Sequence, residues 1–252
     1  MPIKSSYDTG RPCWATCVSD FINVFDFYAN LFGWEFEQLE NAQGYVLARL
    51  NGNVVAGFSP RPTDEVAHWN LSFCSNELPV ITKRVLEAGG STLGPPKELA
   101  ASGTLATYRD SLGTIFSAWH GATRAGFEEV NSNGAYCWAE LCSHDVAESQ
   151  RFYSQVFDWT IAKGSHEVMD YTLFQTGGKT VAGAISMPDQ LRSQHGPFWE
   201  TYFMVPDADV EATRVLTLGG EVLHGPADIP EGRFAICSDP GGAAFSLLAP
   251  PD

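Results

Sequence analysis

The sequence predicts an α+β protein built from four βαβββ units, and two observations support this fold class. The chain repeats itself, because Trp14 and Tyr28 return as Trp138 and Tyr153, 124 and 125 residues later. Each repeat also surrounds amphipathic segments of helical spacing with short, strand-like segments. Further pairs follow in the same order: Val55-Ala56-Gly57 with Val181-Ala182-Gly183, Gly89-Gly90 with Gly219-Gly220, and Phe116-Ser117 with Phe245-Ser246. An ordered series of matches over nearly the whole chain indicates an internal duplication.

The duplication predicts two modules, residues 1–125 and 126–252, with two units in each. The units span about residues 10–59, 67–120, 134–187 and 197–250. The tract 120–133 is polar and contains glycine, so it is the candidate boundary between the halves. We therefore expect a monomer whose two halves form an internal pseudo-dimer.

Unit one begins with a strand at residues 12–19, where alternation puts Trp14, Thr16 and Val18 on one face. Apolar residues at helical spacing predict a helix at 21–32, which Gly33 ends. Three short strands follow at 34–39, 45–50 and 54–59, and the last two are joined by the hairpin signal Asn51-Gly52-Asn53.

The other units keep the same order of elements. Unit two has a strand at 68–74, a helix at 79–88, and strands near 91–93, 104–109 and 114–119. Unit three begins at Tyr136 and unit four at Phe198. The helices of units two and four both end at a double glycine, which is a common stop signal.

The composition restricts the classes of partner. A hydrophobic content of 44% and a charged content of 18% are typical of a globular interior. A net charge of −15 argues against nucleic acid and anionic membrane as partners, because phosphate binding requires clustered Lys and Arg. No apolar run is long enough to cross a bilayer, and the N-terminal residues lack the apolar core of a signal peptide.

Six cysteines are present, none in a C-x-x-C pair, and most lie in apolar, strand-like segments. A thiol in such a segment is usually a small buried hydrophobic group. We therefore expect a reduced, cytoplasmic protein.

Four copies of the strand, helix and three-strand order resemble the vicinal oxygen chelate superfamily, also called glyoxalase/bleomycin resistance/extradiol dioxygenase. The resemblance is carried by FYANLFGW and FYSQVFDW at the first helix of each half, by the Ala-Gly-Gly and Leu-Gly-Gly helix ends, and by the closing strands DSLGTIFSAW and DPGGAAFSLL. It covers about residues 10–250 and implies two glyoxalase-like half-open barrels, each around a pocket. Whether unit one closes its barrel on unit two or on unit four is open from the sequence.

Many members of this superfamily hold a divalent metal ion with His, Gln or Glu from first strands and a Glu from closing strands. The matching positions here are Trp14 and Trp138, then Asn70 and Glu200, then Ser117 and Ser246. Indole cannot ligate a metal, and an amide or a hydroxyl group is a poor neutral ligand. His68 lies only approximately at a ligand position, one or two residues early. We therefore expect no metal ion and no cofactor.

The same positions predict a pocket for a small molecule. If Trp14 and Trp138 face the concave side, with Trp69 or Trp199 on neighbouring strands, indole rings wall each pocket and favour a flat or apolar ligand. Alternatively, the tryptophans fill the barrels and no ligand enters. The candidate ligand-binding residues are Trp14, Thr16, His68, Trp69, Asn70, Ser117, Trp138, Trp199, Tyr202 and Ser246.

The two halves differ in charge at these positions. Glu140 stands where unit one has Thr16, and Glu200 stands where unit two has Asn70. A carboxylate in a Trp-lined cavity would lose its hydration, which raises its pKa toward the range that suits acid or base catalysis. Alternatively, both glutamates form ion pairs or reach solvent. The carboxylates favour a working site in the second half, with Glu140 and Glu200 as candidate catalytic residues.

Within the resemblance, the leading hypothesis is a metal-independent protein that binds an aromatic or otherwise apolar small molecule, as bleomycin-resistance members do. The alternative is an enzyme of the same fold, an isomerase, lyase or cyclase, that uses a pocket glutamate as acid or base. A metal-dependent glyoxalase or dioxygenase is the third hypothesis. The sequence does not decide whether the protein is an enzyme.

Overall fold

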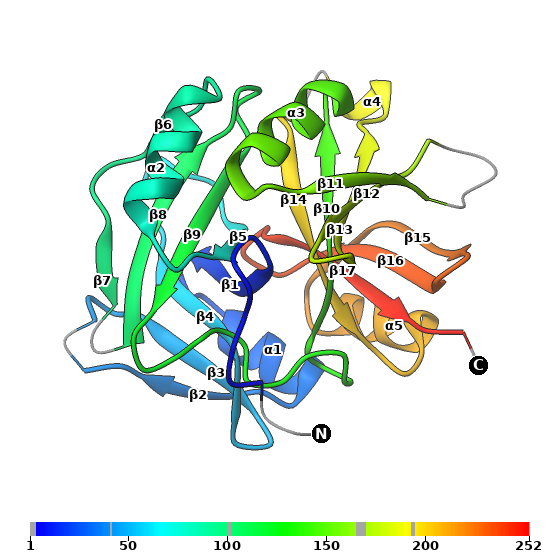
Figure 1. Ribbon diagram of the computed structural model, residues 1–252. Helices are drawn as coiled ribbons and strands as arrows, with labels where there is room; N and C mark the ends of the chain where they lie inside the picture. Colours follow the sequence, from blue (N-terminus) through cyan, green and yellow to red (C-terminus); the bar gives the residue numbers. More distant parts are fainter. Residues whose placement is uncertain (1–3, 41, 100–101, 165–169, 193–194, 252) are drawn as a thin grey trace.

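The computed structural model describes residues 4–40, 42–99, 102–164, 170–192 and 195–251, and it contains two large β-sheets (Figure 1). The first half contains β1 (Pro12–Ser19), α1 (Val24–Phe32), β2 (Glu35–Gln38), β3 (Val46–Leu50), β4 (Asn53–Pro60), β5 (His68–Cys74), α2 (Leu78–Glu87), β6 (Ser91–Thr92), β7 (Lys97–Leu99), β8 (Gly103–Arg109) and β9 (Ile115–Gly121). The second half contains β10 (Tyr136–Ser143), α3 (Val146–Phe157), β11 (Thr160–Lys163), β12 (Thr172–Thr176), β13 (Lys179–Ser186), α4 (Asp189–Arg192), β14 (Phe198–Met204), α5 (Ala208–Thr217), β15 (Glu221–Ile229), β16 (Gly232–Ser238) and β17 (Ala244–Ala249). The predicted α+β class and the repeated order of elements are confirmed.

Each half forms one sheet with the same strand order. The first sheet runs β2-β3-β4-β1-β5-β9-β8-β6, with β7 beside β8, and the second runs β11-β12-β13-β10-β14-β17-β16-β15. The central pairs β1–β5 and β10–β14 are antiparallel. Unit one therefore shares its sheet with unit two, and unit three with unit four, which the sequence left open.

The first helix begins later than its apolar pattern predicts, at Val24 instead of residue 21. Phe21 and Asn23 have φ angles of 68° and 60°, which belong to the left-handed region. A right-handed helix cannot include such residues, so the chain makes a turn before α1. The helix ends where expected, at Gly33 with φ 74°.

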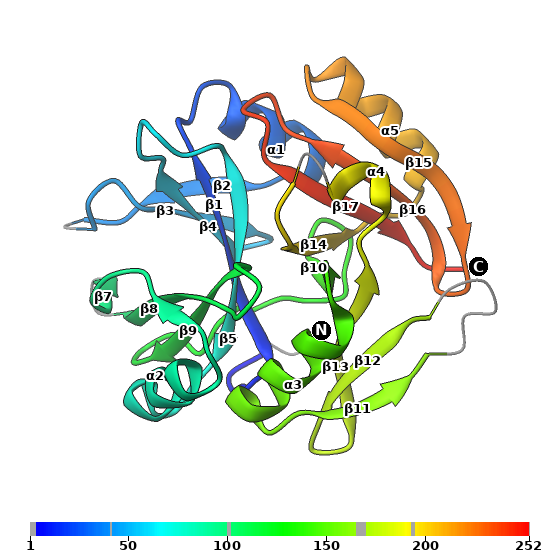
Figure 2. The ribbon, with the colours of Figure 1, turned by 90° about the horizontal axis from the view of Figure 1, so that it is seen from above.

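The two sheets pack back to back through their central strands, and the helices α1 and α3 lie beside this contact (Figure 2). Trp69 of β5 packs on Phe203 of β14, and Phe73 packs on Trp199, each with 5.1 Å between ring centroids. Because these rings are buried, the contact is part of one continuous apolar core.

Buried polar side chains cross the same contact in two matching sets. Trp69 donates to the hydroxyl of Tyr28 (3.0 Å), which donates to Asp239 of the other half (3.1 Å). In the second set, Trp199 donates to the hydroxyl of Tyr153 (2.8 Å), and this hydroxyl donates to Asp110 of the first half (3.1 Å). Each set satisfies an indole N–H and a carboxylate inside the core, as buried polar groups require.

No helix in the described part of the chain combines the length and the apolar character that a bilayer crossing requires.

Candidate functional site

Strand register brings together the predicted polar residues of each half. Thr16 is the cross-strand partner of Asn70, and Glu140 is the partner of Glu200. Cross-strand partners point to the same side of a sheet, so each pair shares a face. This is the face opposite to the helices and to the other sheet, and we call it the concave face of that half.

The first concave face carries neutral polar groups that hydrogen-bond to one another. Asn70 donates through Nδ2 to Oγ of Ser117 (3.0 Å), and Ser117 pairs with the hydroxyl of Thr107 (3.0 Å). The hydroxyl of Thr16 lies 2.8 Å from that of Tyr45. Ser117 is fully buried, so this network is closed to solvent at its centre.

Two tyrosines complete the concave faces, and neither was predicted from the sequence. Trp14 donates through Nε1 to the hydroxyl of Tyr45 (2.8 Å), and Trp138 donates to Tyr171 (3.0 Å). Each tyrosine ring crosses a glycine of the sheet, and a Cβ at Gly183 would collide with the hydroxyl of Tyr171. The internal repeat could have revealed both tyrosines, because Tyr45 and Gly57 recur 126 residues later as Tyr171 and Gly183.

The second concave face contains a buried acid. Glu200 is 6% exposed and accepts a hydrogen bond from Ser246 (2.8 Å). Burial raises the pKa of Glu200 to about 8; the Ser246 hydrogen bond opposes the shift, and the negative charge of Glu140 adds to it. Glu200 therefore carries a proton at neutral pH.

Glu140 lies on the neighbouring strand in a more accessible position. The hydroxyl of Tyr202 donates to its Oε1 (3.1 Å). Burial raises the pKa of Tyr171, and the interaction of this phenol with Glu140 raises it further. The face thus combines two carboxyl groups in different surroundings with an indole ring and two phenols.

The linker between the halves covers the first concave face. Phe127 packs on Trp14 with 5.7 Å between ring centroids, and the carbonyl of Arg124 accepts from Trp119 (3.0 Å). Burial lowers the pKa of Arg124, and the nearby carboxylate of Glu128 opposes this shift. As a result, Trp14 and Thr16 are each only 4% exposed.

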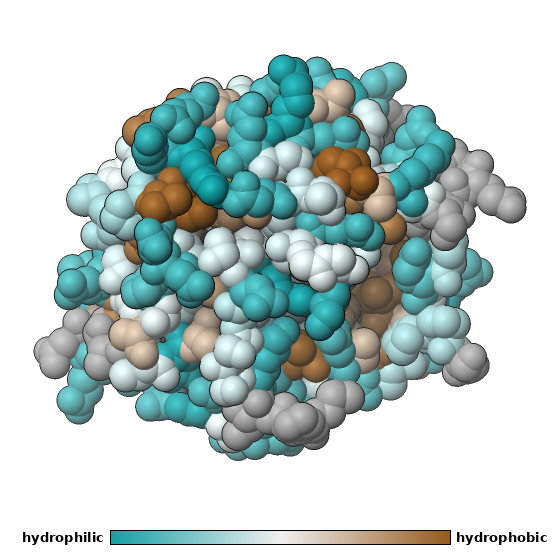
Figure 3. Space-filling model, viewed as in Figure 1, coloured by the Kyte–Doolittle hydropathy of each residue, from teal (hydrophilic) through white to brown (hydrophobic). Residues whose placement is uncertain are grey.

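The second concave face is more open. Trp138 and Glu140, the counterparts of Trp14 and Thr16, are both partly exposed. In the face that Figure 3 shows, apolar side chains are visible between polar ones on the right, where Figure 1 places the second sheet. On the first half, Phe127 of the linker packs on Trp14, the counterpart of Trp138.

Two predicted site residues lie elsewhere. The expectation that Trp69 and Trp199 line the pockets is wrong, because both rings point into the core between the sheets. Successive residues of a strand face opposite sides, so Trp69 cannot share a face with Asn70. His68 keeps the alternation of Asn70 and is the cross-strand partner of Val18, so it lies at the end of the first concave face, with its Nδ1 3.0 Å from the carbonyl of Val66.

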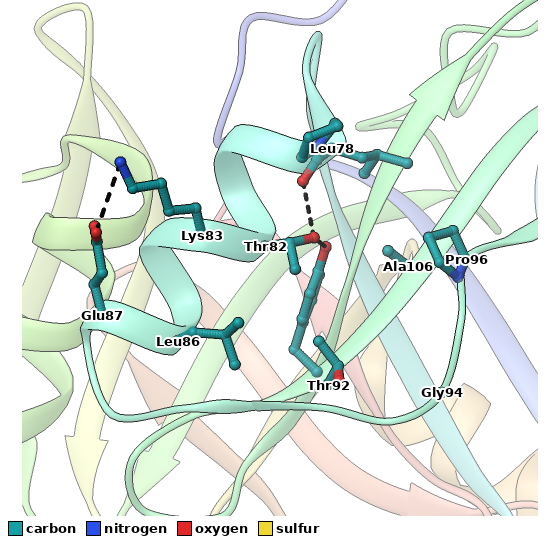
Figure 4. A pocket seen from close by; sticks show the side chains of 11 residues that line it. Leu78, Thr82, Lys83, Leu86, Glu87, Thr92, Gly94, Pro96 and Ala106 are labelled. Carbon is teal, nitrogen blue, oxygen red and sulfur yellow. Dashed lines mark hydrogen bonds and ion pairs between the residues drawn. The ribbon is translucent and has the colours of Figure 1, made fainter.

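One hollow of about 510 Å³ lies away from both concave faces, between α2 and strands β6 and β8 (Figure 4). Its walls are mostly apolar, and the hydroxyl groups of Thr82 and Tyr108 meet inside it at 2.8 Å. None of the predicted site residues lines it.

The donor groups on the concave faces do not fit the metal set that the sequence resemblance implies. The first face offers a Thr, an Asn and a Ser, all neutral, and the second offers two carboxyl groups and a hydroxyl. In the described ranges, no cluster of three or more His, Cys, Asp or Glu could hold a metal ion. A metal at Glu200 would also have to displace a proton that is bound at neutral pH.

Comparisons with known proteins give a consistent result. Residues 138–247 match the model of the Glyoxalase/Bleomycin resistance protein/Dioxygenase superfamily. Protein CFP32 of Mycobacterium tuberculosis, whose name assigns it provisionally to the glyoxylases, is 31% identical over 264 aligned positions, which cover 99% of this chain and 98% of CFP32. The anthracycline biosynthesis protein DauV of Streptomyces sp. strain C5 is 28% identical, over 95% of this chain and 93% of DauV.

Solved structures show the same fold. The Mn(II)-bound glyoxalase of Novosphingobium aromaticivorans superposes with a TM-score of 0.66 at 15% identity, over 96% of this chain and 82% of that chain. The 2,2',3-trihydroxybiphenyl 1,2-dioxygenase of Sphingomonas wittichii RW1 gives the same TM-score and identity, over 96% and 91%. Together with the full-length similarity to CFP32, these matches show that the chain belongs to the glyoxalase/bleomycin resistance protein/dioxygenase superfamily.

Proposed function

We propose that the second concave face binds an aromatic or otherwise apolar small molecule, and that it does so without a metal ion. The observation that carries this proposal is the difference in exposure between the halves. Trp138 is partly exposed beside two phenols, whereas its counterpart Trp14 is covered by the linker. An accessible aromatic wall with a few polar groups is typical of small-molecule sites.

The names of two relatives support a small organic ligand. CFP32 carries the provisional name of a glyoxylase, and DauV is named as a protein of anthracycline biosynthesis. Both are similar to this chain over nearly its whole length, although identity near 30% does not transfer a substrate.

Proton-transfer catalysis is a second candidate, favoured by the carboxyl pair. Protonated Glu200 can give a proton to a bound molecule near neutral pH, because its pKa is about 8. Glu140 accepts a hydrogen bond from Tyr202 and is the candidate proton acceptor. Two carboxyl groups in such different surroundings suit an isomerase, lyase or cyclase.

Native mass spectrometry of the purified protein tests the binding proposal by the mass of any bound molecule, and fluorescence titration with that molecule then measures affinity. Trp138→Phe should weaken binding at least fivefold, because the indole that faces the ligand is lost. The matched variant Trp14→Phe should leave the affinity unchanged. Equal weakening by both variants would contradict a site in the second half.

Glu200→Gln separates binding from catalysis. A binding protein should keep its affinity, whereas an enzyme should bind and lose about a hundredfold in turnover. Elemental analysis of the purified protein tests the metal-free part of the proposal, and a stoichiometric divalent ion would contradict it.

A further inference from the structure

A hollow of about 630 Å³ lies behind the second concave face, on the side of the sheet that carries α3. Its walls come from the first half of α3 and from the helix-facing side chains of β11 and β12, among them Gln150, Ile161 and Thr172. Its volume is within the range of small-molecule sites, about 300–1,000 Å³. Tyr171, whose hydroxyl reaches Trp138 on the concave face, also lines this hollow, whereas Glu140 and Glu200 do not.

In unit one, aromatic rings fill the corresponding space between α1 and its sheet. Phe25 of α1 lies 4.8 Å from Phe21, 4.6 Å from Phe36 of β2 and 5.5 Å from Phe58 of β4, measured between ring centroids. Phe36 and Phe58 are also in contact, at 5.3 Å. This cluster closes the gap between the helix and the sheet.

Unit three replaces most of these rings. By the repeat offsets, Gln150 corresponds to Phe25, Ile161 to Phe36 and Ala184 to Phe58. One ring is restored by Phe174 of β12, which packs on Trp159 (4.8 Å) and Tyr153 (5.9 Å), as Phe58 packs on Trp34 and Tyr28. The other large rings have smaller or polar counterparts, so the hollow results from the sequence and not from an irregular backbone.

The polar groups of the hollow are arranged around its apolar part. Gln150 donates through Nε2 to Oγ1 of Thr172 (2.9 Å), where unit one has the apolar Phe25 and Val46. The amide oxygen of Gln150 takes no part in this hydrogen bond. Gln150 and Thr172 can therefore offer both donors and acceptors to a ligand.

The charged groups around the hollow largely compensate one another. Lys163 pairs with Asp170 at 3.1 Å. Asp145 caps α3 by accepting from the backbone N–H of Glu148 (3.0 Å). Such a lining offers no excess of positive charge for an anion, and it favours an uncharged ligand that hydrogen-bonds through several groups.

We propose that this hollow is a second binding site, for a neutral polyhydroxylated molecule of the size of a hexose or a cyclitol. Hydroxyl groups of the ligand pair with Gln150 and Thr172, and its C–H face lies on Ile161. The site goes beyond the function proposed for the second concave face. It uses neither Glu140 nor Glu200, and Tyr171 is the residue of that face that also lines the hollow.

The test restores the aromatic side chains of unit one. In Gln150→Phe/Ile161→Phe, two rings fill the hollow as Phe25 and Phe36 do in unit one. Gln155→Phe is the matched control, because Gln155 lies on the exposed side of the same helix. Binding of D-glucose and of myo-inositol is measured by saturation-transfer NMR for the wild-type protein and both variants.

The wild-type protein and Gln155→Phe should bind at least one of the two probes with similar affinity, and the double variant should bind at least tenfold more weakly. Equal binding by all three proteins, or no binding of either probe to the wild-type protein, would overturn the proposal. If the double variant does not fold, Gln150→Leu/Thr172→Val removes the hydrogen-bonding groups without filling the space. It must also weaken binding at least tenfold, and unchanged binding would overturn the site.

Discussion

Replacing Glu200 with glutamine should change how the stability of the protein depends on pH. In the folded protein the pKa of Glu200 is raised from 4.5 to about 8, chiefly by burial. Between these values the folded state holds a proton that the unfolded state has released. The free energy of unfolding of the wild-type protein therefore falls as pH rises through this window. Glutamine carries no charge at any of these pH values, so the variant lacks this contribution.

The size of this change in the free energy of unfolding depends on how much of the pH range between 4.5 and about 8 can be measured. The protein has a pI of about 4.7, so measurements should start near pH 6 to avoid precipitation at the isoelectric point. From about pH 6 to the pKa of about 8, each pH unit corresponds to about 1.4 kcal/mol, which gives about 3 kcal/mol. Little is lost to solvent screening, because Glu200 is 6% exposed.

Urea unfolding, followed by tryptophan fluorescence at pH 6, 7, 8 and 9, measures this difference. The free energy of unfolding of Glu200→Gln, relative to wild type, should rise by about 3 kcal/mol from pH 6 to pH 9. Glu35→Gln, at an exposed position of β2, is the control and should run parallel to wild type. If Glu200→Gln also runs parallel to wild type, Glu200 does not hold a proton at neutral pH.

Two further predictions concern contacts that the sequence did not reveal. Tyr153→Phe removes the hydroxyl that joins Trp199 to Asp110, so two buried polar groups lose a partner and unfolding should cost about 1–3 kcal/mol less, as measured by urea unfolding. An unchanged free energy of unfolding would contradict this role. Gly183→Ala should displace the ring of Tyr171, which crosses Gly183, and should weaken ligand binding at least fivefold. Gly196 has open space around it, so Gly196→Ala is the control and should leave the affinity unchanged. Equal affinities in a fluorescence titration would show that the ring position does not matter.

The sequence alone predicted the fold class, because the duplication and the order of elements are written in local patterns. It also identified the pairs of residues that differ between the halves: Thr16 with Glu140, and Asn70 with Glu200. The structure places Thr16 opposite Asn70 on β1 and β5, and it places Glu140 opposite Glu200 on β10 and β14. Alternation along a strand and the repeat offset suffice for this step, since both are local properties.

The tertiary structure decided which of these residues are accessible and what surrounds them. Alternation separates Trp69 from Asn70 but does not say which face meets the other sheet, because this depends on contacts between distant segments. The same holds for Tyr171, whose hydroxyl reaches Trp138 across Gly183, and for the linker that covers Trp14. The sequence by itself determined a doubled scaffold with acids in one half. Only long-range packing decided that this half is the open one and that Glu200 is buried deeply enough to keep its proton.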